Sequence, residues 1–194
     1  MPQADIGGRL RGLAPGSAVA LKFDAREYAD HYFAFLNGTL RDLGGEPGVH
    51  TIYVAVTSPA SFVWSLAQAL DVPADRLSFV DAISHLMMRF DDPLPNATYV
   101  ESPRALEEIM LRIEYLLRRY PHPRPVVVID SVNSLAIHNP PELLSEFLHI
   151  LLNNLKTRQA LTLVLQTTDE QAASVEQLLN LVVDETVDLA RMDR

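Results

Sequence analysis

The sequence has no cysteine and only two lysines among its 194 residues. The absence of cysteine excludes disulfides, thiolate metal sites and a cysteine nucleophile. No stretch approaches the roughly 18 consecutive apolar residues that a membrane-spanning helix needs. The opening segment Met1–Asp5 lacks the basic start and apolar run of a secretory signal. We therefore expect a cytoplasmic protein with no membrane partner.

Basic residues are also few relative to acidic ones. There are 16 Lys plus Arg against 25 Asp plus Glu, so the formal net charge is −9. A chain with this charge repels a phosphate backbone, and we do not expect nucleic acid to be its partner.

Composition and length indicate one globular domain. Hydrophobic residues make up 48% and charged residues 21% of the chain, which is ordinary for a soluble domain with a sizeable core. No internal repeat or Gly/Ser-rich linker divides the sequence. We therefore take 1–194 as a single domain, with 1–9 as a flexible or peripheral segment.

Strand-like and helix-like segments alternate along the chain. Short apolar or β-branched runs predict strands at 17–23, 51–57, 77–80, 98–101, 126–129 and 161–166. Helical spacing or a capping pattern predicts helices at 26–43, from Ser58-Pro59 to near 73, from Ser102-Pro103 to 120, from Asn139 to 155, and from Thr168, with an edge segment at 181–189. This order predicts an α/β fold of three layers, a mostly parallel sheet with helices on both faces. Ligands of such sheets bind beyond the carboxyl ends of the strands.

Three segments resemble those of the KaiC-like members of the RecA superfamily. Gly12–Leu21 (GLAPGSAVAL) is similar to the family's opening, and Leu77–Ala82 (LSFVDA) to its short strand ending in Asp-Ala. Val126–Leu135 (VVVIDSVNSL) resembles its Walker B strand, with Asp130 as the Walker B aspartate. The order of elements fits from about residue 10 to 190. The resemblance implies a RecA-like, P-loop NTPase-like fold that assembles through surfaces burying nucleotide between neighbouring subunits.

The segment after the first strand departs from this family. A nucleotide-binding member needs G-x-x-x-x-G-K-[ST] there, because glycines let backbone N–H groups wrap the phosphates and lysine neutralises their charge. Phe23–Asp30 (FDAREYAD) has no glycine and no lysine, and an ungapped count puts Ala29 at the lysine position and Asp30 at the Ser/Thr position. Carboxylates stand where phosphate would lie: Asp24, Glu27 and Asp30. Arg26 is the only local cation, so nucleotide binding is opposed as well as unsupported.

A second departure follows the second strand. The family carries one or two glutamates there, one of which polarises the attacking water. This chain has Thr57 and Ser58, which are poor bases at neutral pH. With both parts of the phosphoryl-transfer machinery missing, we expect no enzymatic activity, no cofactor and no bound metal, and a vestigial role for Asp130. The alternative for Asp130 is structural, a cap on the turn after the strand.

Other candidate residues have simpler structural interpretations. None of the six histidines forms a pair at helical spacing, so no metal site is expected. Ser131 and Ser134 are expected to cap the turn after the strand, and Asp81 and Asp91–Asp92 to be solvated loop acids rather than a catalytic pair. In the aromatic-rich helix at 26–43, Tyr32 and Phe35 are expected in the core.

Residues further along the chain leave two surface questions open. In the same helix, either Tyr28 or Phe33 is expected to remain exposed. The segment His85–Phe90 (HLMMRF) suits either an adaptable interface or the core.

The sequence therefore predicts a RecA/KaiC-like domain that has lost ATP binding and hydrolysis. Its function would be protein interaction or regulation, by self-association or by pairing with a related RecA/KaiC-like protein. One alternative is a nucleotide- or small-ligand-binding protein or weak ATPase. Its site, at the strand ends, comprises Asp130, Ser131, Thr57, Ser58 and Arg26. A second alternative is an accessory factor in DNA recombination or repair, using a small basic patch of Arg118, Arg119 and Arg124.

Overall fold

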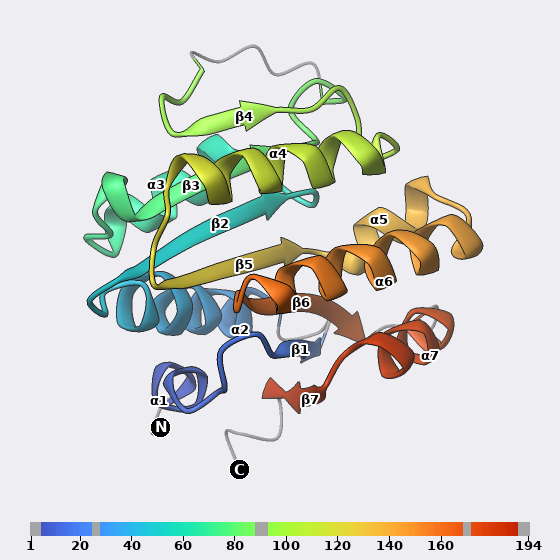
Figure 1. Cartoon of the computed structure of the whole chain (residues 1–194), viewed down its shortest axis with the longest axis horizontal. Coiled ribbons are helices and arrows are strands. Elements are labelled where there is room, and N and C mark those ends of the chain that lie inside the picture. Colours follow the sequence, from blue (N-terminus) through green and yellow to red (C-terminus); the bar gives the residue numbers. More distant parts are fainter. Residues whose placement is uncertain (1–4, 25–27, 88–92, 169–171, 190–194) are drawn as a thin grey trace.

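A computed structural model describes residues 5–24, 28–87, 93–168 and 172–189 of the chain. Within these ranges the strands form one sheet in the order β4-β3-β2-β5-β6-β1-β7, and each neighbouring pair is parallel (Figure 1). The strands are β1 (Ala18–Asp24), β2 (Val49–Ala55), β3 (Leu77–Asp81), β4 (Ala97–Tyr99), β5 (Arg124–Asp130), β6 (Leu161–Thr168) and β7 (Glu185–Asp188). The central strands β2, β3 and β5 are buried almost throughout, as expected for parallel strands covered on both faces.

Helices cover both faces of this sheet. One face carries α1 (Ile6–Arg11), α2 (Tyr28–Leu36), the wider π-helical turn η2 (Asn37–Leu43) and α3 (Ala60–Ala69). The other face carries α4 (Leu106–Arg119), α5 (Val132–His138), α6 (Pro141–Thr157) and α7 (Ala172–Val182). A short 3₁₀ turn, η3 (Ala74–Arg76), precedes β3. The predicted three-layer α/β fold is confirmed (Figure 1).

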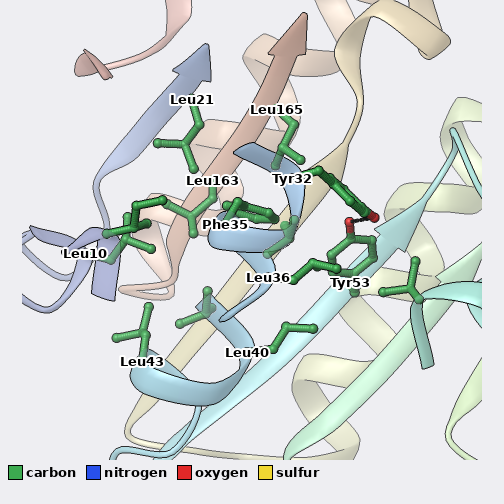
Figure 2. Packing of buried hydrophobic residues seen from close by; sticks show 14 of the residues in the cluster. Leu10, Leu21, Tyr32, Phe35, Leu36, Leu40, Leu43, Tyr53, Leu163 and Leu165 are labelled. Atoms are coloured by element: carbon green, nitrogen blue, oxygen red, sulfur yellow. Dashed lines mark hydrogen bonds between the residues drawn. The ribbon is translucent and has the colours of Figure 1, made fainter. Parts of the chain in front are cut away.

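The core on the α2 face contains the aromatic residues of the first long helix. Phe35 is fully buried with its ring edge-on to that of Phe23 on β1, Leu36 is fully buried near Tyr53 of β2, and Tyr32 is only 6% exposed (Figure 2). Their predicted core positions are therefore confirmed. Phe33, on the opposite side of the helix, is 44% exposed, whereas the side chain of Tyr28 lies outside the described residues.

The N-terminal segment differs from expectation. From Asp5 onward it is packed against the domain, with Ile6 and Leu10 buried in the core on the α2 face. The approach to η2 is close, because a Cβ at Gly38 would lie 2.9 Å from the backbone nitrogen of Gly7. A helix of six residues with two glycines has poor intrinsic helix propensity, so the sequence pattern does not reveal it.

Two other elements differ from the predictions. Helix α5 occupies a segment that was expected to be a turn. The segment 181–189, expected to be an edge element throughout, begins as the end of α7 and becomes strand only at Glu185. In the apolar segment at 85–90, Leu86 and Met87 are about half exposed, at 50% and 49%. His85 is exposed and its ring stacks on that of Tyr99, and residues 88–90 lie outside the described residues. No helix within the described ranges is long and apolar enough to cross a membrane.

A ring stack lies at the opposite edge of the sheet from the strand ends. His50, at the start of β2, is stacked between Tyr120 and His122, with ring centroids 5.0 and 4.8 Å away. Its Nε2 lies 3.0 Å from the Ser78 hydroxyl. Burial, together with the neighbouring charge of His122, lowers the pKa of His50 to about 4. The folded protein thus holds this imidazole in its neutral form.

We expect stability to fall as the pH drops from about 6.5 towards 4, because the unfolded chain takes up a proton that folded His50 resists. The loss attributable to His50 is about 1–2 kcal/mol after allowance for partial solvation. Urea unfolding at both ends of this pH range, compared between the wild-type protein and His50→Gln, measures it. The variant should show a flatter pH dependence, and the exposed control His149→Gln should behave as wild type. Equal slopes for all three proteins would contradict the prediction.

Candidate functional site

The candidate site lies where β2 and β5 end. After β2 the chain crosses the end of β5, and the backbone N–H groups of Val56 and Thr57 donate to the carbonyl of Asp130 at 2.8 and 2.9 Å. β1 and β2 are consecutive in the chain, yet β5 and β6 lie between them in the sheet. Ligands of open parallel sheets bind at such a change of strand order, outside the carboxyl ends. The predicted residues Thr57, Asp130 and Ser131 therefore come together at the expected edge.

Asp130 is sealed by two tyrosines. The hydroxyl of Tyr53 donates to Oδ2 of Asp130 at 2.5 Å, and that of Tyr32 donates to the same oxygen at 2.9 Å. The two hydroxyl oxygens are themselves 2.9 Å apart, and they point toward one another in Figure 2. Asp130 is only 1% exposed. Its carboxyl group therefore bonds across the sheet edge to β2 and α2 and does not cap the turn that follows.

The electrostatics of this cluster follow from its burial. Desolvation raises the pKa of Asp130, and hydrogen bonds from Tyr53, Tyr32 and Thr57 counteract part of that effect. Burial, and then the nearby Asp130 charge, raise the pKa of Tyr53 well above its usual range. Tyr53 therefore stays protonated at neutral pH, and its hydroxyl donates a hydrogen bond to Asp130. No lysine or arginine in the described parts of the chain forms an ion pair with Asp130.

Beside this cluster lies a group of three hydroxyls. The Thr57 hydroxyl lies 3.2 Å from that of Ser131 and 2.8 Å from that of Ser134, and the two serine hydroxyls are 3.3 Å apart. Ser131 is also the N-cap of α5, accepting from the Ser134 backbone N–H at 3.3 Å. The expected capping role is thus confirmed for Ser131, which a cis peptide bond joins to Asp130.

The pattern Ser58-Pro59 predicted Ser58 as the N-cap of the following helix, and this prediction is wrong. The cap residue of α3 is Pro59, and no side chain of its own sequence neighbourhood caps the helix. Instead, Asp81 at the end of β3 accepts the backbone N–H of Ala60 at 2.8 Å. Among the described residues no hydrogen bond connects Ser58 to the three clustered hydroxyls of Thr57, Ser131 and Ser134.

Asp81 is a buried structural acid and not a solvated loop residue. It is 1% exposed and accepts the Ala60 N–H, the Ile83 and Ser84 N–H groups at 3.0 and 2.8 Å, and the Ser84 hydroxyl at 2.6 Å. With its two oxygens so occupied, it has no free lone pair directed at a substrate. The other acids of the suggested pair, 91–92, lie outside the described residues.

The remaining predicted residues do not add to the site. Arg26 lies outside the described residues, and Asp30 is exposed on α2. The basic patch is partly neutralised, since Arg118 pairs with Glu114. Across the described ranges no group of three or more His, Asp or Glu side chains is placed to hold a metal ion.

Sequence reasoning missed the two tyrosine hydroxyls as partners of Asp130. One signal was available for Tyr53, which is a polar-tipped side chain in the continuous run Ile52–Ala55 of a strand expected to be buried. A tyrosine buried there needs a partner for its hydroxyl. The sequence alone does not identify that partner, because Asp130 is 77 residues away in the chain.

Comparisons with known proteins agree with this architecture. The sequence profile of a family described as the ATPase KaiC matches residues 43–194. The match begins after the segment 23–30. Among solved structures, a KaiC-like protein from the hyperthermophilic archaeon Pyrococcus horikoshii superposes with a TM-score of 0.62 at 14% identity, covering 90% of this chain and 72% of that one. At that identity the likeness concerns the fold alone. No curated protein matches the sequence.

Proposed function

Because the chain belongs to the KaiC ATPase family, we propose that it is a member that neither binds nor hydrolyses ATP and that acts as a protein-interaction or regulatory module. The observation that carries the proposal is the burial of the Asp130 carboxyl and its hydrogen bonds to two tyrosines. A Walker B aspartate must present an oxygen toward a magnesium ion, which prefers hard oxygen ligands and keeps several waters. Here Oδ2 accepts two tyrosine hydroxyls, and Oδ1 is buried together with it, so that Asp130 is only 1% exposed. In this arrangement neither oxygen is presented to a magnesium ion and its waters.

The connection after β1 supports the same proposal. From Asp24, where β1 ends, to Asp30 on α2, the sequence contains neither glycine nor lysine. The G-x-x-x-x-G-K-[ST] loop needs glycines so that backbone N–H groups can wrap the phosphates, and a lysine to neutralise their charge. The sequence at this place therefore lacks the residue types that hold phosphates in a P-loop.

The position of the catalytic base supports it as well. Thr57, which follows β2, is hydrogen-bonded to Ser131 and Ser134, and a hydroxyl in such a network is a poor proton acceptor at neutral pH. Loss of activity leaves the fold and its outer surfaces intact. A domain of this kind can associate with itself or with a related KaiC-like subunit and alter that subunit's activity.

Phosphate release from magnesium–ATP tests the proposal. The wild-type protein should release phosphate at the rate of buffer alone, and Asp130→Asn, checked for folding by circular dichroism, should give the same rate. Release that is proportional to protein concentration and is abolished in Asp130→Asn would refute it.

One observation favours a second candidate function, the binding of a small ligand. The three clustered hydroxyls of Thr57, Ser131 and Ser134 lie at the ligand-binding edge of the sheet, and Thr57 is exposed. These three uncharged hydroxyls can donate hydrogen bonds to a polar ligand and accept them from it. A double variant, Thr57→Val with Ser134→Ala, would abolish binding of such a ligand, whereas it should leave a protein–protein function unchanged.

A further inference from the structure

A groove runs between α4 and α6 on the face of the sheet away from α2. The two helices lie side by side in Figure 1, and both begin at the edge where the strands end. Between their first halves lies a hollow of about 540 Å³, and a second hollow of about 570 Å³ adjoins it through Arg104, Asn139 and Leu143. The two hollows form one continuous concave surface, which we call the α4–α6 groove.

Apolar side chains line the α4–α6 groove. Met110 and Phe147 form part of its floor. Leu143 and Ile150 line it while remaining 54% and 41% exposed, and Ile137, 78% exposed, stands at the second hollow. Single exposed apolar residues are ordinary, but several that converge on one concavity mark a recognition surface.

Acidic and basic residues occupy different parts of the groove's rim. Glu107 and Glu146 line it, and neither has an ion-pair partner within the described ranges, whereas Glu108 is paired with Arg112 at 2.9 Å. Arg104 stands at the end where α4 and α6 begin, and the N-termini of both helices add positive potential there. The groove is therefore negative along its length and positive at one end.

We propose that the α4–α6 groove binds an amphipathic helix of a partner protein, with apolar side chains at i, i+3 or i+4, and i+7 and with basic residues on its flanks. The basic residues meet Glu107 and Glu146, and the negative C-terminal end of the helix lies at Arg104, so that the bound helix runs antiparallel to α4 and α6. A convex helix fits a concave groove, whereas the same groove on a second copy of this chain is also concave. This inference gives a surface to the interaction function proposed above and rests on it.

Binding of synthetic helical peptides tests the proposal. Three labelled peptides of about 18 residues, close to the length of α6, carry leucine in the i, i+3, i+4, i+7 pattern and differ only in having Lys, Gln or Glu at the polar positions. Fluorescence anisotropy should show the order Lys, then Gln, then Glu in affinity. A peptide with the leucines and lysines of the first in scrambled order should bind at least about tenfold more weakly.

Variants locate the site. Leu143→Asp should weaken binding of the lysine peptide at least about tenfold, and the charge reversal Glu107→Lys with Glu146→Lys should weaken it severalfold and reduce its salt dependence. The matched control is Leu111→Asp, a leucine of α4 that is 65% exposed and lies outside the groove. It should bind as wild type does.

The opposite results would overturn the inference. Equal binding of the scrambled peptide, or equal loss in Leu143→Asp and Leu111→Asp, would mean that the groove is not the site. A concentration-dependent dimer in sedimentation, lost in Leu143→Asp, would make a second copy the occupant. These outcomes are independent of nucleotide. Release of phosphate from ATP would refute the proposed loss of activity while leaving the groove result intact.

Discussion

Replacing Asp81 with alanine is expected to lower the free energy of unfolding by about 3–5 kcal/mol, because the change leaves three buried backbone N–H groups without their acceptor. Asp81 binds the N-terminus of α3 and the turn after β3 to each other, through Ala60, Ile83 and Ser84. Asp81→Asn retains one acceptor oxygen, and its loss should be intermediate. Urea unfolding followed by circular dichroism measures both variants.

The matched control is Asp75→Ala, at an exposed acid in the turn before the same strand. It should change stability by less than about 0.5 kcal/mol. If Asp81→Ala were as mild as this control, the carboxylate would not be a structural acceptor, and its hydrogen-bonding capacity would be free for chemistry.

Replacing Tyr53 with phenylalanine is expected to destabilise the fold by about 2 kcal/mol, because a buried carboxyl loses a hydrogen bond from a neighbouring hydroxyl. The hydroxyl removed donates to Asp130 at 2.5 Å, and neither residue has access to replacement water, since Tyr53 is 0% exposed. Tyr32→Phe should cost less, since Tyr53 remains as a donor. Tyr115→Phe, at a side chain 46% exposed, is the control and should be close to neutral.

The sign of the pH dependence provides a second readout of the same cluster. The folded pKa of Asp130 is raised, so the unfolded chain ionises first as the pH increases, and stability is lost from the ordinary pKa of the group up to the folded one. Removing the Tyr53 donor raises the folded pKa further and enlarges this loss. In an Asp130→Asn background, Tyr53→Phe should therefore cost less than about 1 kcal/mol. An unchanged cost would mean that the two side chains are not coupled.

The elements with strong local patterns are the ones that sequence reasoning identified. The apolar run at 126–129 predicted a central strand, and the helical spacing at 139–155 predicted α6. Short elements without such a pattern, α1 and α5, were missed, because six or seven residues give too little periodicity. The helix start at Ser58-Pro59 was misassigned for a related reason: the acceptor that satisfies Ala60 comes from Asp81, a contact that local sequence does not encode.

The candidate site, too, was predicted from the sequence only in part. Its position at the strand ends follows from fold class, and Thr57, Asp130 and Ser131 were placed there from their order in the chain. The burial of the Asp130 carboxyl under two tyrosine hydroxyls could not be predicted in this way. It requires three elements to meet: α2 with Tyr32, β2 with Tyr53 and β5 with Asp130. Such a contact requires the sheet order, in which β5 lies next to β2, and no window of the sequence contains it.

The central claim is that this member of the KaiC family does not bind nucleotide, and thermal unfolding with and without millimolar magnesium–ATP tests it most directly. A ligand present at about 100 times its dissociation constant stabilises the folded state by about 2.7 kcal/mol, which for a domain of this size raises Tm by roughly 5–10 °C. We predict no magnesium-dependent shift with ATP, ADP or GTP. A shift of several degrees that requires magnesium and disappears in Asp130→Asn would contradict the account, because Asp130 would then have to leave its tyrosines to hold the metal.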